Sequence, residues 1–440
     1  MDFDHVHFQV DPGTHWYRWF ADKLQFRAEN AVLSEQGQGA SLSIMTQAGV
    51  QIRLSPLPSA DASPPPMVDH EKKSLHGWGA RSGGAQSPGV SDVAFRVPHL
   101  ERAIARVLDA GGTLVQPVRW HSTQTETYKQ ATVSGWGRLH HTLIERCGKS
   151  SPDRASEPTC STDNSDYLGF IPSETEGFCD PSNSSQSNSS QSKSIGWADE
   201  RSTMGSQTTT AGSILPHPRH QRSTDHPLPL ISAIDHVVLN VPKGEMESAV
   251  NWYVKAFGMA KQQQFSIHTE RSALHSQVLR HPDGDVQFPI NEPASPHSQI
   301  QEFLDAYGGA GIQHVALRTE HILEAIAHMR SQGVAFLDVP PTYYEQLQSR
   351  SEFSPELADW EAIARLKILV DWPTETPDAL LLQTFTQPIF GQPTFFFEII
   401  QRQFYQTPQG RRRVQGFGEG NFQALFEAVE REQIKRGQLM

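Results

Sequence analysis

The sequence repeats itself, and this repeat constrains the fold more than any other feature. Three segments of the first half recur in the same order in the second half: FDHVHFQV as IDHVVLNV, GVSDVAFRVPHLERAIARVLDAGG as GIQHVALRTEHILEAIAHMRSQG, and HTLIER as FEIIQR. Two halves that share the order of their segments are typical of a duplicated structural unit.

Each copy combines two hydrophobic periods. FDHVHFQV alternates as a strand does, whereas LERAIARVLDAGG has helical spacing and reaches a helix-terminating glycine at Gly111. We therefore predict an α+β fold of two tandem domains, each built from paired strand–helix–strand units. Each domain should form a curved mixed sheet, an open barrel that wraps a cavity, with its helices outside.

A polar segment separates the two halves. Residues 150–230 contain SNSSQSNSSQSKS and STMGSQTTTAGS, and no hydrophobic period survives there. Such a segment buries too little apolar surface to offset the entropy of ordering it, so we predict that it is disordered or loosely packed. The predicted division is an N-terminal domain at 1–149, this linker at 150–230 and a C-terminal domain at 231–440. Three linker histidines are expected to be solvated: His217, His220 and His226.

Composition excludes several classes of partner. The formal net charge of -12 argues against nucleic acid and anionic membranes. No apolar run approaches the roughly 20 residues of a membrane span, and the first residues lack the pattern of a secretory signal. The 3 cysteines suggest neither a disulfide framework nor a zinc site. We predict a reduced, soluble, cytoplasmic protein.

A carboxylate interrupts the most apolar predicted strand. Glu398 lies in FFFEIIQ, where burying an unpaired charge costs several kcal/mol. The repeat matches its position with His236 and His314, and two histidines with one carboxylate form the facial triad of non-haem Fe(II) oxygenases. Singly, each histidine could instead be a hydrogen-bonded core residue, and Glu398 could pair with Arg402 or Arg318.

The first half has lost this set. Its matching positions are His5, Asp92 and Thr142. Because threonine is a poor metal ligand, we predict that the N-terminal domain binds no metal and that His5 is structural.

These residues make the C-terminal half resemble the 4-hydroxyphenylpyruvate dioxygenase family of the vicinal oxygen chelate superfamily. The matching stretches run from about 234 to 438: AIDHVVLNV, FPINEP, SQIQEFL, GAGIQHVAL, PPTYYEQL, LLLQTFT, FFFEIIQR and GFGEGNFQALFEAVEREQ. The N-terminal half resembles the family's degenerate first domain more faintly, through SDVAFRV and HHTLIER. The resemblance implies two tandem vicinal-oxygen-chelate domains, each of paired β-α-β-β-β units that form an open barrel. The family's short linker pattern, DYLGFIP, here has extra polar sequence on both sides.

The resemblance also implies an activity. Fe(II) would be held by His236, His314 and Glu398 and would convert 4-hydroxyphenylpyruvate and O2 to homogentisate and CO2 by oxidative decarboxylation, ring hydroxylation and side-chain migration. It assigns catalytic roles to Gln299, Gln313 and Gln383. It assigns substrate binding to Ser276, Asn291, Phe385, Phe396, Phe417, Asn421 and Phe422. The C-terminal helix would act as a lid over the cavity.

Two alternatives remain open at this point. A 4-hydroxymandelate synthase would share the fold, iron and substrate but hydroxylate the benzylic carbon. A metal-free ligand-binding module would share only the fold. The expected partners are the small-molecule substrate and O2, without nucleic acid or membrane, and the expected assembly is a homo-oligomer, either a dimer or a tetramer.

Overall fold

The computed structural model describes most of both halves of the chain. The described residues are 1–11, 15–33, 40–46, 48–58, 87–122, 126–147, 229–269, 272–350, 353–372, 379–435 and 437. All of them belong to one compact unit, Met1–Pro158 with Leu228–Met440. The predicted disordered segment lies almost wholly outside the described residues, together with its three histidines and the DYLGFIP island.

The N-terminal half is a mixed sheet with the order β2-β3-β4-β1-β5-β8-β7-β6 within the described residues. Its strands are β1 (Asp2–Val10), β2 (Arg27–Leu33), β3 (Ala40–Met45), β4 (Gln51–Pro56), β5 (Gly89–Arg96), β6 (Leu114–Ser122), β7 (Thr127–Ser134) and β8 (His140–Cys147). The pairs β1–β4 and β5–β8 are parallel, and the other neighbours are antiparallel. Its helices are α1 (His15–Leu24) and α3 (Leu100–Asp109).

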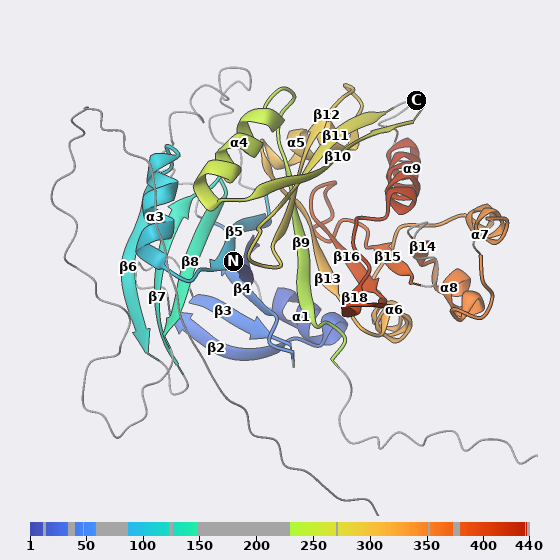
Figure 1. Cartoon of the computed structure of the whole chain (residues 1–440), viewed down its shortest axis with the longest axis horizontal. Coiled ribbons are helices and arrows are strands. Elements are labelled where there is room, and N and C mark those ends of the chain that lie inside the picture. The colour runs from blue at the N-terminus through green and yellow to red at the C-terminus, as the bar shows by residue number, and fades with distance from the viewer. Residues whose placement is uncertain are drawn as a thin grey trace, which may run out of the picture. The chain divides into compact units, whose positions relative to one another are not determined.

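The C-terminal half repeats this topology in the order β10-β11-β12-β9-β13-β16-β15-β14 (Figure 1). Its strands are β9 (Ala233–Asn240), β10 (Ala260–His268), β11 (Ala273–Arg280), β12 (Gln287–Pro293), β13 (Gly311–Arg318), β14 (Leu369–Asp371), β15 (Leu381–Phe385) and β16 (Phe396–Arg402). A separate hairpin pairs β17 (Phe404–Thr407) with β18 (Gly410–Arg413). The helices are α4 (Met246–Phe257), α5 (Gln299–Tyr307), α6 (Ile322–Ser331), α7 (Pro341–Gln348), α8 (Trp360–Leu366) and α9 (Glu419–Lys435). The predicted α+β fold of two tandem mixed sheets is confirmed.

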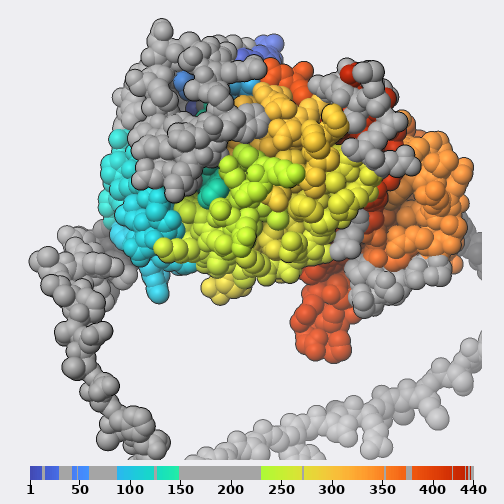
Figure 2. Space-filling view, turned by 90° about the horizontal axis from the view of Figure 1, so that it is seen from above, coloured from blue at the N-terminus to red at the C-terminus, as the bar shows by residue number. Residues whose placement is uncertain are grey.

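Local sequence explains where several helices begin and end. The side chain of Ser298 caps α5 by accepting from the Ile300 N–H, and Asp359 caps α8 by accepting from Ala362. Helix α4 ends at Gly258, whose φ of 68° is a left-handed conformation that glycine adopts without steric cost. In the space-filling view the surface of α4 and β10–β12 lies between that of α3 and that of α7 and α8 (Figure 2).

The two halves share one hydrophobic core. The ring of Phe8 in β1 lies 4.9 Å from the ring of Phe395, which directly precedes β16, and 6.1 Å from that of Phe397, which lies within β16. His141 Nε2 lies 3.0 Å from the Tyr253 hydroxyl across the same boundary. Strand β16 is therefore covered on both faces, as its unbroken apolar run predicts.

The sequence analysis missed elements whose pattern is polar or exposed. Strand β6 has no fully buried residue, and β10 begins with the polar run AKQQQ, so neither strand has the clear apolar–polar alternation from which a half-buried strand is predicted. The prediction of reduced cysteines is wrong at Cys147, which is disulfide-bonded. An odd count and wide spacing do not prevent one pair from forming. Within the described residues no helix is long and apolar enough to cross a bilayer.

Candidate metal centre

The sheet places His236, His314 and Glu398 on one face of three neighbouring strands. Strand β13 lies between β9 and β16, and Ala316 of β13 pairs with His236 on one side and with Glu398 on the other. His314 precedes Ala316 by two residues, so its side chain points to the same face. The repeat in the sequence thus becomes a cluster in space.

The three side chains converge and are fully buried. Their potential ligand atoms all lie within 4.8 Å of one another. Glu398 Oε2 lies 3.1 Å from His236 Nε2 and 3.6 Å from His314 Nε2. Among the described residues this is the only cluster of histidine, cysteine and acidic side chains with the spacing of metal ligands.

The histidines lack the partners that a structural role would require. Neither ring nitrogen of His314 has a hydrogen-bond partner, and Nε2 of His236 faces only the Glu398 carboxylate, at 3.1 Å. Buried polar groups in proteins are nearly always hydrogen-bonded, so the core-histidine alternative fails for His314. Glu398 pairs with neither of the two arginines considered, because Arg402 donates instead to Asp235 and Arg318 Nη1 also lies nearest Asp235, at 3.9 Å. A cation bound by all three residues would satisfy these atoms.

Asp235 and Arg402 orient the first histidine. His236 Nδ1 donates to Asp235 Oδ1 at 3.0 Å, and Arg402 donates to the two Asp235 oxygens at 2.8 and 2.9 Å. Burial acts to raise the pKa of Asp235, but Arg402 and His236 outweigh it and hold that pKa well below its usual range. An ionised carboxylate on Nδ1 fixes the tautomer in which Nε2 can ligate.

Charge distinguishes the two histidines. Burial acts to lower the pKa of His236, but Glu398 and Asp235 raise it to about 9. A positive charge is thus favoured at Nε2 when no other cation is there. Burial, with the nearby charge of His236, lowers the pKa of His314 well below its usual value, so its imidazole is neutral and able to ligate.

Gln383 holds the other oxygen of the carboxylate. Its Nε2 donates to Glu398 Oε1 at 2.9 Å and to the Phe417 carbonyl at 3.2 Å. Its Oε1 accepts from Asn421 Nδ2 at 2.7 Å. Only Oε2 of Glu398 therefore faces the two histidines.

Aromatic rings enclose the site. Phe396 stacks on His314 at 4.8 Å, and Phe417 meets the His236 ring nearly edge-on at 5.0 Å. Phe385 lies behind Phe396, with 6.2 Å between ring centres. These apolar walls limit the access of water to the three ligands.

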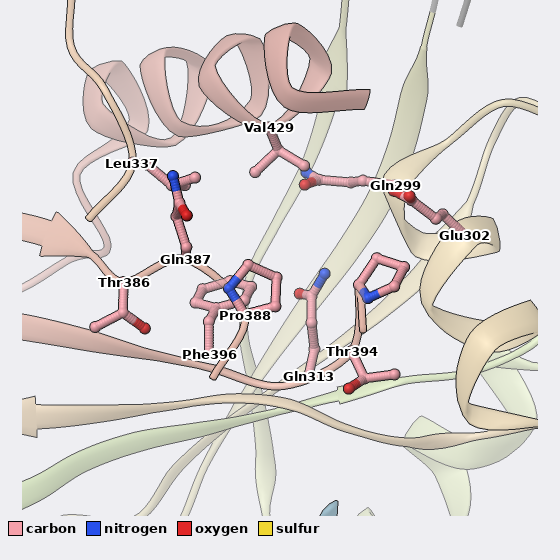
Figure 3. Close-up of a pocket in the computed structure, with 11 residues that line it drawn as sticks. Gln299, Glu302, Gln313, Leu337, Thr386, Gln387, Pro388, Thr394, Phe396 and Val429 are labelled. Atoms are coloured by element: carbon pink, nitrogen blue, oxygen red, sulfur yellow. The ribbon is translucent and has the colours of Figure 1, made fainter. Parts of the chain in front are cut away.

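A cavity of about 190 Å³ lies beside the site (Figure 3). Its lining comes from α5, α9, β13, the start of β16, the segment that joins β15 to β16, and the segment between α6 and α7: Gln299, Glu302, Gln313, Leu337, Thr386, Gln387, Pro388, Pro393, Thr394, Phe396 and Val429. The three candidate metal ligands are not among the residues that line it. Phe396 is, and its ring also stacks on His314, so it lies between this cavity and the candidate metal position.

Three other predicted substrate residues lie away from this cavity. Two are on β11 and β12, which are separated from β13 and β16 by β9 in the sheet, and the third is on α9. Ser276 of β11 pairs with Asn291 of β12, and Asn291 donates to Asn240 Oδ1 at 3.4 Å. Ser276 Oγ and Asn291 Oδ1 are buried and lack partners. Phe422 packs on Phe265, at 5.1 Å between ring centres. The structure thus gathers Gln383, Phe417 and Asn421 at the metal ligands, and Gln299, Gln313 and Phe396 at the cavity.

Sequence reasoning missed Asp235 and Tyr343, and it considered Arg402 only as a partner of Glu398. Asp235 and Arg402 carried a signal, because the repeat matches Asp235 with Asp4 and Arg402 with Arg146. Tyr343 carried none, because its hydroxyl reaches the site only through tertiary contacts. It donates to Asn421 Oδ1 at 3.1 Å.

Comparison with known proteins gives consistent matches. The sequence model of the Glyoxalase/Bleomycin resistance protein/Dioxygenase superfamily matches residues 233–353. A 4-hydroxyphenylpyruvate dioxygenase of Coccidioides posadasii is 32% identical over 448 residues, which cover 100% of this chain and 94% of the relative. The enzyme of the same name from Caenorhabditis briggsae is 35% identical over 80% of this chain and 74% of its own length.

Two further matches concern parts of the chain or the fold alone. An uncharacterised protein of Synechocystis is 45% identical over 211 residues, which span 48% of this chain and 60% of that protein. Among solved structures, a mutant 4-hydroxymandelate synthase from Streptomyces coelicolor aligns with a TM-score of 0.64, 21% identity and 98% coverage of both chains. At that identity the likeness shows the fold.

Proposed function

The chain belongs to the 4-hydroxyphenylpyruvate dioxygenase family, and from this premise we propose that it converts 4-hydroxyphenylpyruvate and O2 to homogentisate and CO2 at a non-haem Fe(II). The observation that carries the proposal is the set of three buried side chains whose unpaired atoms face one another, His236, His314 and Glu398. Two imidazoles and one carboxylate, without thiolates, fit Fe(II) and leave its remaining positions open.

The bound iron would supply the redox chemistry that couples decarboxylation of a 2-oxo acid to hydroxylation of its ring by O2. The protein's own residues prepare the site. Asp235 holds His236 in the ligating tautomer, and Gln383 keeps Oε1 of Glu398 occupied. Phe396 and Phe417 exclude water from the side of the histidines.

Uncharged polar groups would bind the substrate. Ser276 and Asn291 each bring a buried atom without a partner, and a ligand oxygen would satisfy either of them. Gln299 and Gln313 line the adjacent cavity, and an amide can donate or accept there without adding charge beside the metal. Phe385 and Phe422 would add apolar walls for the aromatic ring, as the family resemblance predicts.

Other expectations stay predictions. These are the three-part division at 1–149, 150–230 and 231–440, the homo-oligomeric assembly and the cytoplasmic location. A small-molecule substrate is consistent with the buried, aromatic-lined site.

Product identity tests the proposed function. We would load the full chain with Fe(II), incubate it in air with 4-hydroxyphenylpyruvate, and identify the product by mass and chromatographic retention. Homogentisate is the expected result. Formation of 4-hydroxymandelate would assign the chain to the synthase reaction, and unchanged substrate with bound iron would contradict both activities. Failure to bind iron would favour a metal-free binding module.

A further inference from the structure

A continuous chain of hydrogen bonds begins at the metal ligand Glu398 and ends on a distant helix. Gln383 Nε2 donates to Glu398 Oε1 at 2.9 Å, and Asn421 Nδ2 donates to Gln383 Oε1 at 2.7 Å. The Tyr343 hydroxyl lies 3.1 Å from Asn421 Oδ1. The chain passes from β16 to β15, then to the first turn of α9, and ends on α7.

The groups at the inner end fix the direction of every bond. A ligating carboxylate and the Phe417 carbonyl can only accept, so the Gln383 amide must turn its NH2 group toward both. Its oxygen then accepts from the Asn421 NH2 group, which leaves Asn421 Oδ1 facing Tyr343. Because Asn421 Oδ1 can only accept, Tyr343 is the donor at the outer end, and its single hydroxyl hydrogen is shared between Asn421 Oδ1 and the Val370 carbonyl. Burial raises its pKa, so the hydroxyl keeps the proton that this role needs.

Tyr343 is anchored at the edge of the sheet. The Val370 N–H donates to the Tyr343 hydroxyl oxygen at 2.8 Å, and the hydroxyl donates to the Val370 carbonyl at 2.9 Å. Strand β14, which contains Val370, is the last strand in the sheet order. The hydroxyl thus contacts backbone groups that a further strand would otherwise pair, and it holds a fixed position relative to the sheet.

The neighbouring Tyr344 provides an internal comparison. Its hydroxyl donates to the Ile368 carbonyl at 3.1 Å, so it also ties α7 to the backbone beside β14. The two rings meet at 89°, with 5.0 Å between their centres. Within the described residues, only the Tyr343 hydroxyl continues to Asn421 and the metal ligand.

We propose that Tyr343 is a positioning residue for the metal ligand. Through Asn421 and Gln383, its hydroxyl holds Glu398 with Oε1 engaged and Oε2 directed at the two histidines. This inference rests on the proposed function, because it presumes that these side chains bind a metal. Since Asn421 lies in the first turn of α9, the hydrogen-bonded chain is complete only while α9 is seated. The position of that helix is thereby coupled to the geometry of the ligand.

Co(II) titration of matched variants tests the role. Co(II) is the probe because its visible absorption reports both its affinity and its coordination without turnover. Tyr343→Phe is expected to weaken Co(II) binding about 5-fold, somewhat less than the roughly 10- to 100-fold typical of groups that contact a ligand directly. Tyr344→Phe should leave the Co(II) affinity and spectrum unchanged. Thermal unfolding of the metal-free proteins measures the structural cost, which both variants should share because each loses a bond to backbone.

A double-mutant cycle separates positioning from a general loss of packing. In the Asn421→Ala background, Tyr343→Phe should cause no further loss of Co(II) affinity, because the path is already cut. Asn421→Asp is the second variant: it keeps the acceptor that faces Tyr343 and removes the donor that faces Gln383. It should weaken Co(II) binding even if Tyr343→Phe does not fold.

Three results would overturn the inference. These are equal Co(II) affinities in Tyr343→Phe and Tyr344→Phe, independent losses in the double mutant, or wild-type affinity in Asn421→Asp. In each case Co(II) still binds the wild-type protein, and the proposed function stands. A wild-type chain that binds no Co(II) would instead remove the metal site and, with it, both proposals.

Discussion

The two halves of the chain share the support around one histidine but differ in what that histidine faces. In the N-terminal half, Asp4 lies 2.9 Å from His5 Nδ1 and 2.6 Å from Arg146 Nη2. The repeat matches Asp4 with Asp235 and His5 with His236. Both halves thus hold an aspartate between a histidine and an arginine, so the support alone does not make a metal site.

The difference lies at the two other matched positions. Asp92 and Thr142 occupy the places of His314 and Glu398. Thr142 donates to both Asp92 oxygens, from its hydroxyl at 2.8 Å and from its backbone N–H at 3.2 Å. The N-terminal carboxylate is therefore satisfied by its own strand neighbour. Two side-chain replacements turn unpaired ligands into a closed hydrogen-bonded pair on the same backbone.

The largest effect is expected when the residue of the N-terminal half is placed at the matched position of the C-terminal half, that is, when Glu398 is replaced by the threonine found at Thr142. Glu398→Thr should abolish turnover, because it removes the anionic ligand and leaves a threonine that binds metal poorly. Metal analysis of the purified protein and a homogentisate assay would measure this. The matched control, Thr142→Ala, should keep full metal content and activity. Substantial turnover by Glu398→Thr would remove that residue from the mechanism.

The ion pair between the aspartate and the arginine can be removed in either half. Arg402→Met leaves Asp235 buried without its cation, and breaking such a pair costs about 3–5 kcal/mol of unfolding free energy. Arg146→Met should cost about 1 kcal/mol or less, because Arg146 is partly exposed and Arg96 also reaches Asp4. Urea unfolding of the metal-free variants measures both. Equal losses would show that burial does not distinguish the two pairs.

The pH dependence of metal binding should come from one half only. Below its pKa of about 9, His236 carries a proton that must leave before Nε2 can ligate, so metal affinity rises with pH until that value. The expected slope is about tenfold per pH unit between pH 6 and 8. In the other half burial lowers the pKa of His5, so it has no such proton to release. Calorimetric titration in buffers of different ionisation enthalpy would count the released proton, and a pH-independent affinity would contradict the account.

The smallest effect is expected from changing the hydrogen-bonded pair of Asp92 and Thr142. Thr142→Val keeps the shape of the side chain but leaves Asp92 with one donor fewer, which should cost about 1–2 kcal/mol of unfolding free energy. Metal affinity should not change, because no ligand is touched. A loss of metal binding in this variant would show that the N-terminal cluster acts on the site.

The buried cluster of candidate ligands was predictable from sequence, because the repeat supplies its own alignment. His236, His314 and Glu398 occupy matched strand positions, and neighbouring strands with a two-residue period bring such positions together. The helix that ends before Gly111 was also predictable, because its apolar spacing is a local pattern and a glycine follows it. That glycine has a φ of 85°, a left-handed conformation typical of a helix end.

The hydrogen bond between Tyr343 and Asn421 was not predictable, because it joins residues 78 positions apart that lie outside the repeated segments. The bond between Arg402 and Asp235, which are 167 positions apart, carried a signal in the repeat but was not predicted. Strand β10 was missed because Lys261 and the glutamines after it are more exposed than a strand pattern requires. Pairing with β11, not hydrophobic alternation, defines that strand.

Diffraction at the iron absorption edge tests the central claim most directly. The measurement would use crystals of the full chain loaded anaerobically with Fe(II). The account predicts one anomalous peak within bonding distance of His236 Nε2, His314 Nε2 and Glu398 Oε2, and none beside His5. A peak elsewhere, or no peak in protein shown by metal analysis to contain iron, would contradict it.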